Sequence, residues 1–180
     1  MEIATSPTRD KYPLSPKKII KKTITSMIAW LFVLGFFVLM VSGMIAGIMA
    51  DSNQGITTIF GAIFTGLFVF AFLFIVIGTL TYLYQRWYFA VYYYDIRDDF
   101  IVIKKGPITP KEITIPWERI QDVYVDQDIF DRMFGLFDVH LSTATLMSGM
   151  QAHIDGVEQQ AADGLREVLL GKIKSRISQK

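Results

Sequence analysis

The sequence contains no cysteine and only two histidines among its 180 residues. The absence of cysteine excludes a disulfide scaffold, a thiol nucleophile, a thiolate metal site and an iron–sulfur cluster. The 18 basic and 17 acidic residues leave a net charge of +1, which disfavours a strongly basic nucleic-acid-binding protein. Hydrophobic residues make up 52% of the chain, and their uneven distribution is more informative than their total.

Charged residues are absent from residues 23–50 and 52–85. The first run has 21 apolar residues among 28, and the last 30 residues of the second run also have 21. Both runs exceed the roughly 20 residues that span a bilayer, where the backbone must pair its polar groups internally. The sequence therefore predicts two transmembrane helices, Ile24–Ala50 and Ile56–Tyr84. The short polar turn 51–55 between them makes the pair an antiparallel hairpin.

Basic residues indicate which side of the membrane each helix end faces. Five lysines precede the first uncharged run, namely Lys11, Lys17, Lys18, Lys21 and Lys22. The turn has no Lys or Arg, whereas Arg86 directly follows the second run. The positive-inside rule therefore predicts a multi-pass protein of the cell (inner) membrane with both termini in the cytoplasm. A cleaved signal peptide is disfavoured, since its apolar region would be only roughly 7–15 residues long.

Composition divides the chain into three parts. Residues 1–22 contain three of the six prolines and carry a net charge of +4, which predicts a flexible basic cytoplasmic tail. Residues 23–85 form the predicted two-span hairpin. Residues 86–180 have 44 apolar residues among 95 and a net charge of −2, which is an ordinary soluble composition. This last part is predicted to be a cytoplasmic domain.

Small residues recur at a spacing of four in both predicted spans, as Gly43-x-x-x-Gly47 and Ala62-x-x-x-Gly66. Small residues allow two helices to approach closely. Packing of the hairpin against itself is the favoured interpretation, and association with another membrane protein is the alternative. The spans contain no Asp, Glu, Lys, Arg or His, which disfavours a proton pump or an ion-coupled transporter core.

The predicted domain begins with strand patterns and ends with a helix pattern. Aromatic, β-branched or alternating residues predict strands at Trp87–Tyr94, Phe100–Ile103, Glu112–Ile115, Ile120–Asp126, Phe137–Thr143 and Met150–Ile154. Residues 128–135 predict a single helical turn with Asp128 as its N-cap and Gly135 at its end. The inward-facing residues of this turn are expected to be Phe130, Met133 and Phe134. Asp155-Gly156 predicts a turn before an amphipathic helix that begins at Val157.

The segment Ile115–Val123 reads IPWERIQDV, and Arg132-x-x-Gly135 follows it before a predicted strand. These motifs, placed after a pair of spans, resemble the bacterial membrane-flanked PH-like domain family (YdbS/YdbT-like), and the resemblance covers residues 24–178. It implies a PH-like α+β fold, in which a bent seven-stranded antiparallel barrel or sandwich is capped by the C-terminal helix. The resemblance implies no reaction and no cofactor. The expected fold class is therefore a two-span helical hairpin plus a cytoplasmic PH-like domain.

Nine residues carry this resemblance, namely Ile115, Pro116, Glu118, Arg119, Ile120, Gln121, Asp122, Val123 and Gly135. Pro116 ends a predicted strand, and Arg119 is placed to pair with Glu118 or Asp122 across a corner. A role in folding is therefore favoured for these residues, and partner binding is the alternative.

No pattern in the sequence indicates catalysis or metal binding. The acidic residues Asp122, Asp126, Asp128 and Asp131 lack the regular oxygen ligands, glycine and terminal glutamate of a calcium loop. Two predicted strands carry the only histidines, His140 and His153, with no carboxylate placed beside them to complete a zinc site. Nucleophile-elbow, phosphate-loop and dinucleotide-binding motifs are also missing. We therefore expect no catalytic residue, no metal and no cofactor.

Lysines near the second predicted hairpin turn are the candidate lipid-binding residues, namely Lys104, Lys105 and Lys111. The first hairpin turn, Arg97-Asp98-Asp99, is net negative and unsuited to lipid phosphates. We therefore expect a non-catalytic, membrane-anchored binding or scaffold protein. Its expected partner is a membrane protein, such as a related PH-repeat protein, with no nucleic acid. The alternatives are a sensor of anionic lipid head groups and, third, an enzyme of envelope lipids.

Overall fold

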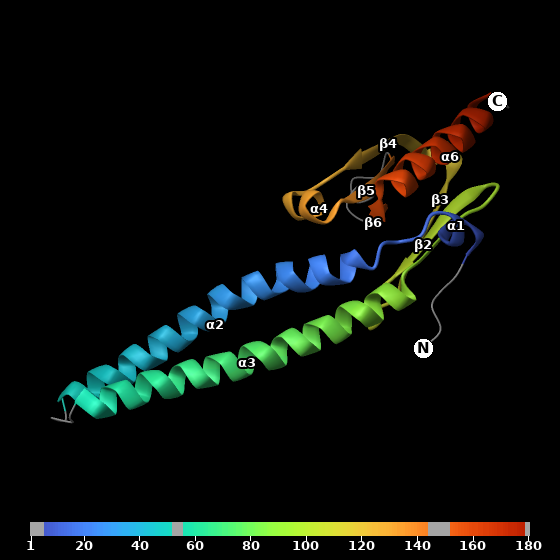
Figure 1. Ribbon diagram of the computed structural model, residues 1–180. Coiled ribbons are helices and arrows are strands. Elements are labelled where there is room, and N and C mark those ends of the chain that lie inside the picture. The colour runs from blue at the N-terminus through green and yellow to red at the C-terminus, as the bar shows by residue number, and fades with distance from the viewer. Residues whose placement is uncertain (1–5, 52–55, 144–151, 179–180) are drawn as a thin grey trace. The chain divides into compact units, whose positions relative to one another are not determined.

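The computed structural model describes residues 6–51, 56–143 and 152–178, and these form two compact units. Lys22–Tyr84 form one unit, here called the hairpin. The described residues before and after it, up to Lys21 and from Gln85, form the second unit, here called the domain (Figure 1).

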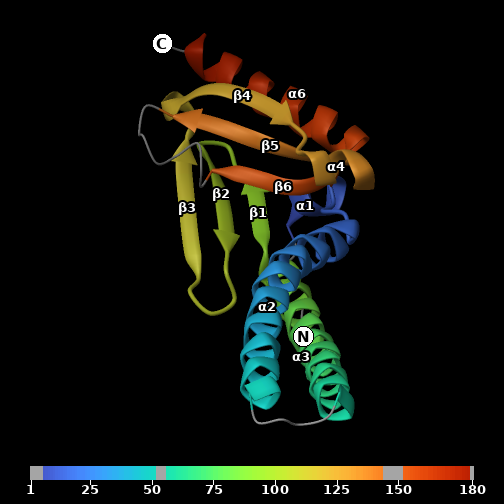
Figure 2. The ribbon, with the colours of Figure 1, turned by 90° about the vertical axis from the view of Figure 1, so that its left-hand side faces the viewer.

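The hairpin consists of the long parts of two helices, α2 (Lys17–Asp51) and α3 (Ile56–Val91), which lie side by side (Figures 1 and 2). Both helices are long and apolar enough to cross a membrane. Most of their large apolar side chains point outward and are exposed. Such an exterior matches hydrocarbon rather than water, because apolar surface is stabilised by removal from water.

Helix α3 runs further than predicted, through most of the expected strand Trp87–Tyr94, so this strand prediction was wrong over residues 87–91. Aromatic residues here follow helical spacing: the rings of Tyr88 and Tyr92 lie 6.1 Å apart. The Tyr92 amide donates to the Tyr88 carbonyl at 3.0 Å. One turn of aromatic packing therefore extends the helix to Val91, two residues before β1 begins.

The domain contains two three-stranded antiparallel sheets. The first sheet has the order β1-β2-β3, with β1 (Tyr93–Ile96), β2 (Phe100–Lys105) and β3 (Lys111–Pro116). The second has the order β4-β5-β6, with β4 (Ile120–Asp126), β5 (Leu136–Thr143) and β6 (His153–Glu158). A short 3-10 helix, η1 (Trp117–Arg119), joins the sheets. The first two residues of the predicted strand Met150–Ile154 lie outside the described residues.

The last strand ends later than predicted, and the last helix begins later. Asp155 and Gly156 lie within β6 rather than in a turn, because Gly156 adopts a φ of +79° where the register with β5 shifts. Val157 also belongs to β6, and its side chain is buried in the core. Helix α6 (Gln159–Ile177) then packs its apolar stripe on the second sheet and on η1, with Leu165 and Leu169 fully buried.

Helix α4 (Ile129–Phe134) forms as the sequence predicts, with a correction to its orientation. The Asp128 side chain accepts from the Asp131 amide at 2.6 Å, and Gly135 ends the helix with a φ of +66°. Met133, predicted to face inward, is exposed, and Asp131 is buried in its place. The polar residue faces inward because a lysine from a distant segment meets it there.

The N-terminal segment, here residues 6–21, differs from the flexible tail that composition predicts. It contains α1 (Pro7–Lys11) and the first turn of α2. The Ser6 hydroxyl donates to the Tyr94 carbonyl of β1 at 2.6 Å. Further along, the Ser15 amide donates to the Gly156 carbonyl of β6 at 2.9 Å. The segment therefore lies between an edge of each sheet (Figure 2), which orders it.

Candidate functional site

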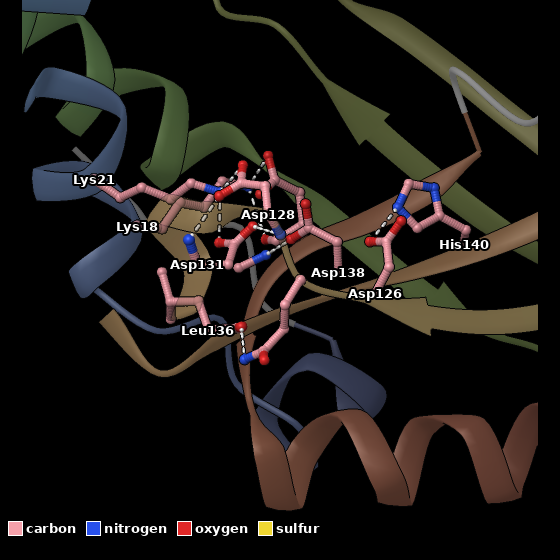
Figure 3. Close-up of polar contacts among 11 residues, drawn as sticks. Lys18, Lys21, Asp126, Asp128, Asp131, Leu136, Asp138 and His140 are labelled. Carbon is pink, nitrogen blue, oxygen red and sulfur yellow. Dashed lines mark hydrogen bonds and ion pairs between the residues drawn. The ribbon is translucent and has the colours of Figure 1, made fainter. Parts of the chain in front are cut away.

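Six charged side chains lie together where the N-terminal segment meets the domain (Figure 3). We call them the lysine–aspartate network: Lys18, Lys21, Asp128, Asp131, Asp138 and Asp155. The two lysines come from the start of α2, and the four aspartates come from the α4 cap, α4, β5 and β6. Residues far apart in the sequence thus form one mostly buried polar cluster.

Lys21 is the most deeply placed cation of the network, with only 2% of its side chain exposed. Its Nζ lies 2.5 Å from Oδ1 of Asp131, which is 1% exposed, and 2.9 Å from Oδ2 of Asp128. Burial alone would raise the pKa of Asp128, but hydrogen bonds from Lys21 and the Asp131 backbone outweigh it and lower that pKa. The charges of Lys21 and α4 therefore stabilise each other.

Lys18 joins the same helix start to β6. Its Nζ donates to the Asp155 carbonyl at 2.8 Å and lies 3.3 Å from the Asp155 carboxylate. The ammonium also lies 4.2 Å from the ring centroid of Tyr92, a cation–π contact. Because Lys18 and Lys21 are three residues apart, one face of α2 presents both cations to the domain.

Asp138 is the titratable member of the network near neutral pH. Burial, followed by the charge of Asp155, raises the pKa of Asp138 to about 7. Its Oδ1 still accepts the Gly156 amide at 2.7 Å, which opposes the rise. The negative charge of Asp155 thus disfavours ionisation of Asp138.

Asp126, Asp138 and His140 are the described residues with a metal-like arrangement, since one ligand atom of each lies within 4.8 Å of the others. Sequence analysis predicted no carboxylate beside His140. Internal contacts explain the arrangement: His140 Nε2 lies 3.1 Å from Asp126 Oδ1, and its ring stacks on Tyr124 and His153. Burial, with a further contribution from the charge of Lys105, lowers the pKa of His153 to about 4. We propose no metal at this position.

The three candidate lipid-binding lysines lie at one end of the β2–β3 hairpin. Lys105 and Lys111 face each other in the register, and Lys104 faces Glu112. An exposed ion pair joins Lys104 Nζ to Glu112 at 3.0 Å. The turn between the strands starts at Gly106, whose φ of +96° suits glycine. The structure therefore places the three lysines around one turn.

The residues of the family-like signature divide between the core and the surface. The apolar members are buried: Ile115, Ile120 and Val123. Pro116 is half-buried, and the polar members are exposed: Glu118, Arg119, Gln121 and Asp122. Within the described part of the chain, Arg119 forms no ion pair with Glu118 or Asp122. The buried Trp117 instead ties the corner together by donating to the Asp98 carbonyl at 2.8 Å.

Small residues take different positions within the hairpin. A Cβ on Gly66 would lie 2.7 Å from the Ser42 hydroxyl of the facing helix, so this glycine allows close approach. A Cβ on Gly43 or Gly47 would meet nothing within 4 Å. Ala62 and Gly66 line an apolar groove of about 590 Å³ between the two helices.

Sequence reasoning missed the lysine–aspartate network, because it assigned Lys18 and Lys21 only to membrane topology. The available signal was the three-residue spacing of Lys18 and Lys21, which places two cations on one face of a helix start. Nothing in the local sequence pairs them with Asp131 or Asp155, more than 100 residues away. This pairing is a tertiary contact.

A family model described as "Bacterial PH domain" matches residues 28–173. This match covers most of both spans and the domain from Gln85 to residue 173, but not the N-terminal segment. No curated protein matches the chain, and no solved structure matches it.

Proposed function

The chain belongs to the bacterial PH domain family, and from this premise we propose that it is a non-catalytic binding or scaffold protein. In this proposal, two spans anchor it in the inner membrane, both termini are cytoplasmic, and the PH-like domain is presented to protein partners. Lys and Arg flank the uncharged runs on the side of the termini, which supports this orientation.

The observation that carries the proposal is that the domain includes both chain connections to the hairpin. The N-terminal segment packs on β1 and β6 and continues into α2 without a loop. On the other side, α3 ends at Val91 and β1 starts at Tyr93. Two short connections are expected of a domain that is held and presented at a membrane surface. A domain on a flexible tether would require neither connection to be short. Confinement to a surface raises the effective concentration for membrane-bound partners.

Strand β3 provides the surface at which we propose that a partner binds. Among the described residues, β3 pairs with β2 alone, so its other edge has no described neighbouring strand. An extended segment of a partner can add to such an edge by main-chain hydrogen bonds. The corresponding edge of β6 is occupied in this chain by Leu14, which pairs with Val157.

A photo-crosslinking residue in place of Thr114, an exposed residue of β3, tests this proposal in native membranes. We expect crosslinks to one protein, with few from the same residue in place of Asp163, an exposed position on α6. Equal yields at both positions, or crosslinks to lipid alone, would contradict binding of a partner at the β3 edge.

Recognition of anionic lipid is the second candidate function. The placement of Lys104, Lys105 and Lys111 around one turn favours it. A specific head-group pocket would require converging phosphate ligands. The structure instead arranges these lysines around a projecting turn, which leads to a different mode of lipid contact.

A further inference from the structure

The domain exposes three large apolar side chains over more than two thirds of their surface. These are Ile108 at 69%, Ile129 at 79% and Met133 at 74%. Ile108 lies in the turn between β2 and β3, and Ile129 and Met133 lie one helical turn apart on α4. Single exposed apolar residues are ordinary. The positions of these three relative to the chain's connections to the hairpin make them informative.

The β2–β3 turn projects from the end of the first sheet at which the chain arrives from α3. Tyr93, the first residue of β1, pairs with Lys104 in the register and comes two residues after the end of α3. Because β1 and β2 are antiparallel, β2 continues past Tyr93 toward Lys105 and the turn. Ile108 therefore lies beyond the start of β1, at the end of the sheet where the last turn of α3 connects to it.

Helix α4 lies at the other chain connection. Its cap Asp128 and its buried Asp131 both bind Lys21 Nζ, at 2.9 and 2.5 Å. The first uncharged run begins at Thr23, two residues after Lys21. Ile129 and Met133 thus lie on α4, the helix whose cap and buried aspartate bind Lys21 directly before the first apolar run begins.

Charge around Ile108 is positive, although residues 86–180 together carry −2. The strand ends beside the turn supply Lys104, Lys105 and Lys111, and Glu112 is the nearby acid. An exposed apolar side chain on a turn whose flanking strand ends carry cations matches the boundary between lipid head groups and acyl chains. Charge complementarity therefore selects an anionic bilayer surface as the occupant of this turn.

We propose that the β2–β3 turn and α4 dock on the anionic surface of the membrane that the hairpin spans. Ile108 enters the interfacial layer, and the three lysines attract lipid phosphates around it. Ile129 and Met133 form a second apolar contact. This inference rests on the proposed membrane anchoring, but it needs no protein partner and no head-group pocket.

The absence of cysteine makes a direct test feasible, because one introduced cysteine is the sole labelling site. A fluorophore is attached at Ile108→Cys or Met133→Cys in the full chain, reconstituted into phosphatidylcholine vesicles with about one-third phosphatidylglycerol. Lipids with a nitroxide on the acyl chain then quench any label that reaches the interface. Leu170→Cys is the matched apolar control. It lies on α6 near Lys172, which binds Asp98 in the β1–β2 turn, the opposite end of the sheet.

We expect strong quenching at 108 and 133 and weak quenching at 170. A label at Phe68→Cys, exposed on α3, reports insertion of the hairpin. Quenching at 68 with none at 108 or 133 would overturn the surface docking and leave the proposed anchoring intact. Absence of quenching at 68 would overturn both.

The lysines are tested by changing Lys104, Lys105 and Lys111 together to Gln in the Ile108→Cys chain. Each lysine removed should lower the ratio of docked to undocked turn by about fivefold in anionic vesicles. In the Ile108→Cys chain that keeps all three lysines, pure phosphatidylcholine vesicles or added salt should lower the quenching as the triple change does. Unchanged quenching in the triple variant would contradict the proposal. Quenching that appears only when other membrane proteins are present would also overturn it, in favour of a protein contact.

Discussion

The hairpin and the domain place their apolar side chains on opposite sides, outward in the hairpin and inward in the domain. The hairpin has an apolar exterior, whereas the domain has an apolar core and buries lysines and aspartates where the N-terminal segment packs on the rest of it. In hydrocarbon the exterior needs no polar groups. In a domain surrounded by water, a buried charge is strongly destabilising unless it is paired. The difference teaches that the lysines before the first span have two roles, in topology and in domain structure.

Removing one buried partner from the network should have the largest effect on the domain. Lys21→Met leaves Asp131 buried without its cation, which should lower the free energy of unfolding by about 3–5 kcal/mol. Lys17→Met is the matched control, because Lys17 forms an exposed pair with Glu158 that contributes about 0–1 kcal/mol. Thermal unfolding of the detergent-solubilised full chain measures both. Equal losses in the two variants would contradict the burial of Lys21.

A charge on the hairpin exterior should be nearly as costly, although the same charge on the domain exterior should not be. Phe68→Arg, on the exposed face of α3, should disfavour membrane insertion by about 2.5–3.5 kcal/mol. Thr114→Arg on β3 should leave insertion unchanged. The fraction of chain extracted from membranes by carbonate reports insertion. Normal insertion of the Phe68→Arg variant would argue against the lipid-facing position of α3.

Asp138 should make the stability of the domain depend on pH in a predictable direction. Its pKa is raised from 3.8 to about 7 in the folded chain, so folding takes up a proton there. Its contribution is therefore fully present below pH 3.8 and is lost as the pH rises through about 7. Asp138→Asn should remove this loss, so the variant should gain stability relative to the unchanged chain between pH 4 and pH 8. Parallel pH profiles of melting temperature would contradict the assignment.

The smallest expected effect separates the glycines of the hairpin. Gly66→Ala introduces a Cβ 2.7 Å from the Ser42 hydroxyl, so the two helices must shift, whereas Gly43→Ala meets open space. We expect a loss of about 1 kcal/mol or less for the first change and none for the second. Disulfide crosslinking between cysteines placed on α2 and α3 compares the two variants. A loss of stability in Gly43→Ala, with none in Gly66→Ala, would contradict the assignment of Gly66 as the glycine that allows close approach.

Sequence patterns predicted most elements of the fold because those elements depend on local chemistry. The uncharged runs predicted both long helices, and Asp128 and Gly135 predicted the two ends of α4. Family membership, inferred from the segment Ile115–Val123, agrees with the match to the bacterial PH domain model. These features rest on periodicity, capping and turn residues, which neighbours in the sequence determine.

The errors occurred where tertiary contacts override local patterns. Residues 87–91 have strand-like composition but continue α3, because Tyr88 packs on Tyr92 along a helix. Gly156 reads as a turn but forms an irregularity in β6, whose edge the N-terminal segment covers. The exposure of Met133 follows from the distant pairing of Asp131 with Lys21. None of these contacts is visible in a local window of the sequence.

Presentation of the domain in the cytoplasm is the central claim, and a cysteine at Thr114 tests it most directly. The chain has no other cysteine, and Thr114 is exposed on β3. A membrane-impermeant maleimide is added to intact spheroplasts and, in parallel, to lysed ones. The account predicts no labelling in intact spheroplasts and full labelling after lysis. Labelling at Thr114→Cys in intact spheroplasts would place the domain outside the cell and contradict the account.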